Sequence, residues 1–136
     1  GNLCRPRGGS PLVRGIRGAT TVRRDDPGEV LGATRELLSE IVSQNGVRPS
    51  EVAAILFTVT GDLLSAYPAA AVRERAGWEA VPLFSSVEPA VKGSLPHCIR
   101  LMLLWETDVP QGEVRHVYLR GARGLRPDLA EVQGGS

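Results

Sequence analysis

A helix with clear start and stop signals lies between two strand-like segments, and this order constrains the fold more than any other feature. Asp26 is placed to cap the helix, Pro27 suits its first turn, and Glu29 follows three residues after the cap. Asn45-Gly46 is a typical stop signal. The apolar stripe of the helix is Val30, Thr34, Leu37, Leu38, Ile41 and Val42. Residues 51–62 are apolar on both faces, as in a strand buried from both sides, so the alternation predicts an α/β arrangement.

Shorter elements follow this first unit. Residues 67–77 predict a second helix, and residues 79–88 predict a strand that ends at Glu88. Residues 97–107 read as a long buried strand, and residues 114–125 as a last strand that pairs antiparallel with it. Residues 126–132 predict a terminal helical turn. With the first strand at 14–22, the sequence predicts about five strands and two helices, an α+β or α/β fold.

Composition places this chain among single-domain proteins. Its 136 residues fit one domain, for which we expect a tail at 1–12, a folded part at 13–129 and a flexible C-terminal tail at 130–136. A domain of this size buries only a moderate core, so oligomerisation would be a natural supplement. We expect no membrane segment or signal peptide, and two cysteines favour a reducing cytoplasm. The net charge of +1 and the scattered arginines argue against nucleic-acid binding.

Two arginines lie in the middle of strand-like segments, where charge is unexpected. Arg17 shares a strand face with Val13, Gly15 and Ala19, and glycine in a strand often marks close approach of a ligand or another backbone. Arg100 shares a face with Cys98, Met102 and Leu104. A buried, unpaired charge costs several kcal/mol, roughly speaking, so Arg100 needs an anion. That anion is either a structural glutamate or an anionic ligand.

The other candidate groups are less specific. Glu88 is either a solvated or paired strand-end acid or a functional one, and Tyr118 is either half-core or a ligand contact. His97 and His116 lack metal-ligand spacing with each other or with Cys98, which argues against a zinc site. The sequence contains no nucleophile-elbow motif and no glycine-rich phosphate loop. The residues alone therefore predict an anionic ligand without naming a reaction.

Taken together, the motifs resemble the small, single-function chorismate mutases of the AroH class. The resemblance covers about residues 13–129 and rests on Glu88 and six segments. They are RGIRGATTV at 14–22, YPAAAVRE at 67–74, GWEAVPL at 77–83, CIRLML at 98–103, TDVPQGEVRHVYL at 107–119 and LRPDL at 125–129. It implies a mixed five-stranded sheet with helices on one face, assembled as a pseudo-α/β-barrel homotrimer. It also implies rearrangement of chorismate to prephenate, on the route to phenylalanine and tyrosine, in clefts between subunits without cofactor or metal.

The resemblance also implies roles for single residues. Arg17 matches the arginine that holds a substrate carboxylate, assisted by Tyr118. Arg100 matches the arginine that reaches the ether oxygen and a carboxylate. Glu88 matches the acid that accepts a hydrogen bond from the ring hydroxyl.

Further matching positions come from other segments. Tyr67 and Arg73 match residues contributed by the adjacent subunit, whereas Leu125 and Arg126 match a C-terminal segment that covers the site. The family carries a cysteine near the substrate hydroxyl at the position of Ser85, where serine still forms hydrogen bonds. A lysine of the family is replaced here by Ala70, which removes one positive charge near the cleft mouth.

Two rival functions stand beside this one. The trimeric enamine/imine deaminases share the general architecture and also direct a cleft arginine at a carboxylate, but their characteristic motifs are missing here. A trimeric module that binds a small carboxylate without catalysis is the second rival. The complete charged set Arg17, Arg73, Glu88 and Arg100 argues against it.

Overall fold

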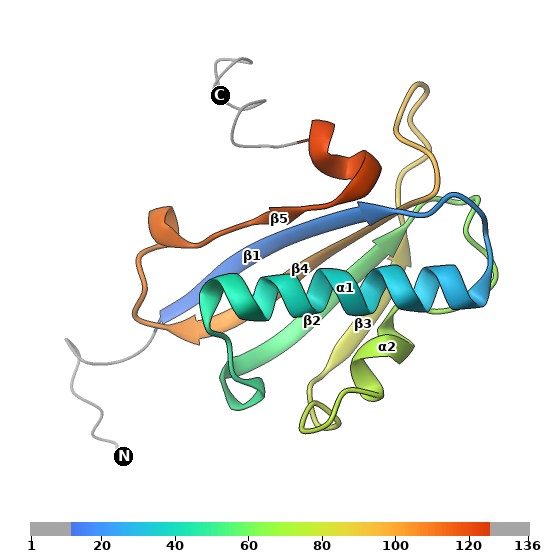
Figure 1. Ribbon diagram of the computed structural model, residues 1–136. Helices are drawn as coiled ribbons and strands as arrows, with labels where there is room; N and C mark the ends of the chain where they lie inside the picture. Colours follow the sequence, from blue (N-terminus) through green and yellow to red (C-terminus); the bar gives the residue numbers. More distant parts are fainter. Residues whose placement is uncertain (1–11, 126–136) are drawn as a thin grey trace.

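A mixed five-stranded sheet with two helices on one face forms the core of the fold (Figure 1). The computed structural model describes residues 12–125. The strands are β1 (Leu12–Thr21), β2 (Val52–Val59), β3 (Leu83–Val87), β4 (Cys98–Thr107) and β5 (Val117–Tyr118), in the order β3-β2-β4-β1-β5. Short 3₁₀ helices η1 (Pro49–Glu51), η2 (Gln111–Glu113) and η3 (Arg120–Gly124) lie in the connections. The predicted five strands and two helices are confirmed.

Helix α1 (Pro27–Asn45) begins and ends where its local signals predict. The Asp26 side chain accepts a hydrogen bond from the Glu29 backbone N–H at 3.1 Å, which satisfies one free donor of the first turn. Gly46 takes a left-handed φ of 77° and donates its N–H to the Val42 carbonyl at 2.8 Å. Five of the six predicted stripe residues are buried against the sheet, and Val42 packs partly buried beside them.

The hydrophobic core lies between the helices and one face of the sheet. Ile16, Ile55, Phe57 and Leu103 are fully buried there under α1. On the opposite face Leu56 is 41% exposed, so within a single chain the prediction that residues 51–62 are buried from both sides is wrong. The physical reason is that both helices pack on the same face (Figure 1). The other face, which we call the open face, has no α-helix over it among the described residues.

Strand β5 does not pair with β4 as the sequence predicts. It runs parallel to β1, with Gly18 opposite Val117 and Ala19 opposite Tyr118. Strand β4 already has β1 on one side and β2 on the other, so it offers no free edge to a further strand. The chain does reverse direction after β4, and this makes β5 parallel to β1, because β1 and β4 are antiparallel.

Helix α2 (Ala69–Arg73) is shorter than the predicted helix over 67–77. After it, the Arg75 N–H donates to the Val72 carbonyl and the Trp78 N–H to the Arg75 carbonyl, both at 3.0 Å, so the chain continues in tighter turns. Gly77 takes a φ of 88°, and this reversal buries Trp78. Strand β3 starts at Leu83, later than predicted, because the preceding Pro82 lacks an N–H for the ladder.

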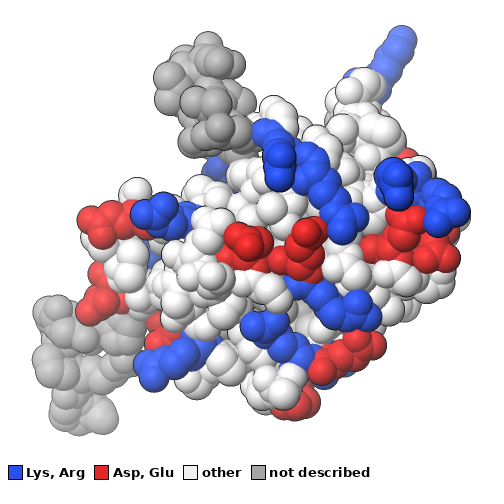
Figure 2. All heavy atoms as spheres, viewed as in Figure 1, with Lys and Arg blue, Asp and Glu red and all other residues white. Residues whose placement is uncertain are grey.

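Acidic and basic side chains are interspersed on the face that carries α1, so this face is not a basic stripe (Figure 2). Three ion pairs are formed by residues of α1, namely Arg24–Glu29 at 2.9 Å, Arg120–Glu36 at 3.0 Å and Arg35–Glu74 at 3.7 Å. Among residues 12–125, no helix is both long and apolar enough to cross a bilayer.

Gly18 allows α1 to approach β1 closely, and replacing it should destabilise the fold. A Cβ at this position would lie 2.8 Å from Ile41 Cδ1 and 3.3 Å from both Leu101 Cγ and Leu37 Cδ1. We expect Gly18→Ala to lower the free energy of unfolding by about 1–3 kcal/mol in urea titrations, because the buried neighbours have little room to shift. Gly32→Ala on α1 is the matched control. A Cβ there would make only an ordinary contact, 3.8 Å from Arg35 Nη1, and should raise stability by about 0.5–1 kcal/mol. Equal effects of the two substitutions would contradict the close-packing argument.

Candidate active site

A pocket of about 480 Å³ lies on the open face and holds both strand arginines. Its volume lies within the range of roughly 300–1,000 Å³ that is typical of ligand sites. Cross-strand register brings the side chains together, because Arg17 pairs with Met102 and Ala19 pairs with Arg100. Tyr118 joins them from β5, opposite Ala19. The residues around the pocket are Arg17, Gly18, Ala19, Leu56, Thr58, Arg100, Leu101, Met102 and Tyr118.

Arg100 carries an unsatisfied donor in this pocket. Its side-chain Nε is buried and has no hydrogen-bond partner within residues 12–125. The described part of the chain also places no carboxylate within ion-pair distance of Arg100. The neighbouring Cys98 does not supply an anion, because burial raises the pKa of its thiol above the ordinary value despite the opposing effect of Arg100. Of the two anions that the sequence left open, the geometry therefore favours a ligand over a structural glutamate.

Arg17 is held at its backbone by the segment that precedes and includes β5. The Arg17 N–H donates to His116 Nδ1 at 2.9 Å. Two residues earlier, the Gln111 side-chain amide pairs with Gly15, accepting from its N–H at 3.0 Å and donating to its carbonyl at 2.8 Å. These side chains extend the sheet beyond the short β5. They keep β1 in register where Arg17 faces the pocket.

The two glycines beside Arg17 have packing roles. A Cβ at Gly15 would lie 2.9 Å from Met102 Sδ, and Gly18 lies under α1. The close approach that the sequence predicted here is therefore made by neighbouring protein atoms.

Glu88 directly follows β3 and lines a neighbouring pocket with the loop that comes after it. Its backbone N–H donates to the Val59 carbonyl at 2.7 Å, which continues the β2–β3 pairing by one step. Its side chain accepts a hydrogen bond from the Thr58 hydroxyl, and Thr58 lines the pocket directly. The structure thus places Arg17, Arg100 and Tyr118 in one pocket and joins Glu88 to that pocket through Thr58.

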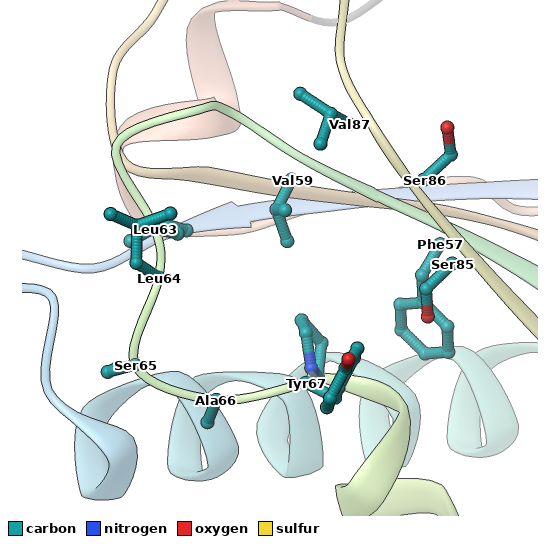
Figure 3. A pocket seen from close by; sticks show the side chains of 11 residues that line it. Phe57, Val59, Leu63, Leu64, Ser65, Ala66, Tyr67, Ser85, Ser86 and Val87 are labelled. Atoms are coloured by element: carbon teal, nitrogen blue, oxygen red, sulfur yellow. The ribbon is translucent and has the colours of Figure 1, made fainter.

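Tyr67 and Ser85 lie in a second pocket, of about 400 Å³, on the face that carries the helices (Figure 3). Phe57 and Val59 of β2 line this pocket, whereas Leu56 and Thr58 line the first. Because side chains alternate along a strand, the two pockets lie on opposite faces of the sheet. Within one chain the sheet therefore separates Tyr67 and Ser85 from the arginines.

The remaining predicted residues line neither of these two pockets. Arg73 is exposed on α2. It follows the pocket residues Tyr67 and Pro68 closely in the sequence but does not itself line the second pocket. Leu125 follows η3 and is half-buried, and Arg126 lies outside the described residues. Ala70, at the position where the resemblance implies a lysine, is half-buried in α2. In the part of the chain that the structure describes, no three His, Cys, Asp or Glu side chains are grouped to hold a metal.

Thr58 is a pocket residue that the sequence analysis missed. Its signal is faint, because a threonine in an apolar strand is ordinary. The strand alternation that places Thr58 and Leu56 on one face was available in the sequence. The cross-strand partner of Thr58, which is Arg100, was not.

Comparison with known proteins gives consistent matches. Residues 13–129 match the family model described as chorismate mutase type I. Chorismate mutase AroH of Thermus thermophilus is 54% identical over 123 residues, which are 90% of this chain and 100% of that protein. Chorismate mutase AroH of Bacillus subtilis (strain 168) is 48% identical over 119 residues, 88% of this chain and 94% of that protein. A solved chorismate mutase from Clostridium thermocellum aligns with a TM-score of 0.78 at 42% identity, covering 81% of this chain and 97% of that one.

Proposed function

The chain belongs to the chorismate mutase type I family and is a chorismate mutase, and we propose that it holds its substrate in the open-face pocket between Arg17 and Arg100. The expected family and activity are confirmed, and the two rival functions, deaminase and carboxylate-binding module, are set aside. The observation that carries the proposed location is the buried, unpartnered Nε of Arg100 in a pocket shared with Arg17.

Chorismate matches the chemistry of this pocket. The substrate carries two carboxylates, and Arg17, with Tyr118 beside it, would hold one of them in the ground state. Arg100 would direct its donors at the other carboxylate and at the ether oxygen. Glu88, joined to the pocket through Thr58, would accept a hydrogen bond from the ring hydroxyl. Burial of the Arg100 Nε supports this assignment. A buried donor without a partner is costly, so a hydrogen bond from it to an acceptor on the bound substrate is favourable.

The reaction suits a site of this kind, because it is a unimolecular rearrangement that requires no proton transfer. The enzyme must hold chorismate in a compact, chair-like form with the reacting carbons close together. As the ether bond lengthens, negative charge grows on its oxygen, and a fixed cation stabilises that transition state more than the ground state. A million-fold acceleration corresponds to about 8 kcal/mol, which positioning and electrostatics would share.

We further propose that a neighbouring subunit completes each site in a homotrimer. The two pockets of one chain lie on opposite faces of its sheet, so the Tyr67 pocket of one copy would meet the arginine pocket of the next. Arg73 would come from that neighbour as well. An open sheet face that exposes Leu56 at 41% and Phe84 at 65% supports such an interface, since large exposed apolar groups mark interaction surfaces.

Two further assignments are proposals of the same kind. Leu125 and Arg126 would cover the completed site, since η3 begins two residues after Tyr118 of β5 and leads directly into them. A reducing cytoplasm is our proposed location. The free and buried state of Cys98, the one cysteine within residues 12–125, supports it.

The role of Arg17 is tested by steady-state kinetics, following the loss of chorismate absorbance. We expect the purified protein to consume chorismate, and Arg17→Ala to raise KM by about 10- to 100-fold with a smaller effect on kcat, because a charged hydrogen bond to a ground-state carboxylate is lost. Arg48→Ala is the control, since Arg48 pairs with Glu51 at 2.9 Å and lies outside both pockets. An unchanged KM in Arg17→Ala would place the carboxylate elsewhere.

A further inference from the structure

Thr58 lies between Arg100 of the open-face pocket and Glu88, which lines the neighbouring pocket. It lies on β2 directly opposite Arg100 of β4, and both side chains line the pocket. Its hydroxyl donates a hydrogen bond to Oε1 of Glu88, which follows the neighbouring strand β3. Thr58 is thus joined to Arg100 by strand register and to Glu88 by a side-chain hydrogen bond.

Few other interactions fix the position of the Glu88 carboxylate. Within residues 12–125, Thr58 is the only side chain that hydrogen-bonds it, and its backbone is fixed only through the N–H to Val59. Pro89 and the loop that leads to β4 follow, and this loop projects away from the sheet (Figure 1). Thr58, which bonds the Glu88 carboxylate, is also the cross-strand partner of Arg100, so the carboxylate and the guanidinium lie in the same neighbourhood. An untethered carboxylate there would be drawn to the Arg100 guanidinium.

We propose that Thr58 is a positioning residue for Glu88, an inference that rests on the proposed role of Glu88. By donating to Oε1, the hydroxyl keeps the carboxylate away from Arg100 and leaves Oε2 to accept from the substrate hydroxyl. Arg100 then keeps its donors for the substrate. Without the Thr58 hydroxyl, Glu88 and Arg100 would form an ion pair, and each would lose its function toward the substrate.

Two substitutions at Thr58 separate the hydroxyl from the shape of the side chain. Thr58→Val retains the branched shape and removes the donor, and we expect kcat to fall about tenfold, the effect of one hydrogen bond to a charged group. Thr58→Ser retains the donor and should remain within about threefold of the parent. Thr60→Val is the matched control, because Thr60 bonds Asp62 and Cys98 rather than Glu88. It should lower the urea midpoint while leaving kcat within about twofold.

A double-mutant cycle distinguishes positioning from a general loss of structure. In a Glu88→Ala background, Thr58→Val should change kcat by less than about twofold, because the group that it positions is gone. An equal loss in both backgrounds, or a loss in Thr58→Ser as large as in Thr58→Val, would overturn the inference. If Glu88→Ala is impaired but Thr58→Val is fully active, only the inference fails. If Glu88→Ala itself retains parental activity, the proposed role of Glu88 and the inference fail together.

Discussion

Arg100→Ala is expected to lower kcat by roughly 100- to 1,000-fold while KM changes by only a few-fold. Arg100 sits on the central strand β4 with a buried Nε that no group among the described residues satisfies. In the role that we propose for it, a cation fixed in this way would meet the charge that develops on the ether oxygen without reorganising, so its loss would raise the barrier more than it weakens ground-state binding. Steady-state measurement of chorismate consumption over a range of substrate concentrations separates kcat from KM.

Arg14→Ala provides the control for loss of a strand arginine. Arg14 is also partly buried, but its Nε donates to the Val109 carbonyl at 2.8 Å and it lines neither of the two pockets. Its removal should lower stability and leave kcat close to the parental value. The proposed role of Arg100 is wrong if Arg100→Ala, correctly folded by circular dichroism, keeps kcat within a few-fold of the parent.

Mixing two inactive variants should restore about a quarter of the parental activity if sites are shared between subunits. Arg73→Ala and Arg100→Ala are unfolded, combined in equal amounts and refolded together. A site is intact when its Arg100 comes from an Arg73→Ala chain and its Arg73 from an Arg100→Ala chain. Each choice has even odds in a cyclic trimer, so roughly one site in four is complete. Size-exclusion chromatography checks that both variants and the mixture form trimers.

The matched control for this experiment mixes Arg17→Ala with Arg100→Ala. Both arginines line the same pocket of one chain, so every mixed site lacks one of them and no activity should return. Recovery in the first mixture and none in the second would support a site built from two chains. Mixed trimers that gain nothing over the separate variants would contradict the interface, although the reaction assignment would stand.

Local sequence signals were sufficient to predict an element when the residues that fix its two ends lie within or next to it. Helix α1 was predicted to within a residue because its cap at Asp26, its stop at Gly46 and its apolar stripe all lie within its own sequence. The helix at 67–77 was overpredicted, because burial of Trp78 through the turn at Gly77 ended it early. The partner of β5 was mispredicted, because it depended on which edges of β1 and β4 were already occupied.

The residues of the candidate site also fall into those that the sequence indicated and one that only the structure revealed. Arg17 and Arg100 could be identified from the sequence because a charge within an apolar strand is costly to bury unless an anion or a hydrogen-bond acceptor pairs with it. The resemblance to the chorismate mutases supplied their expected roles and those of Glu88 and Tyr118. Thr58 had neither signal, because its proposed role depends on strand register opposite Arg100 and on a hydrogen bond to a residue 30 positions away.

By itself, the sequence determined the family, the strand and helix periodicity of the main elements, and the presence of arginines that require an anion. Only the tertiary structure decided that Arg17 and Arg100 share a pocket, that Glu88 is tethered by Thr58, and that Tyr67 and Ser85 lie across the sheet from them. The physical reason is the distance along the chain over which each interaction acts. Caps and apolar stripes act over a few residues, whereas strand order and the face that the helices cover emerge only when distant segments pack together.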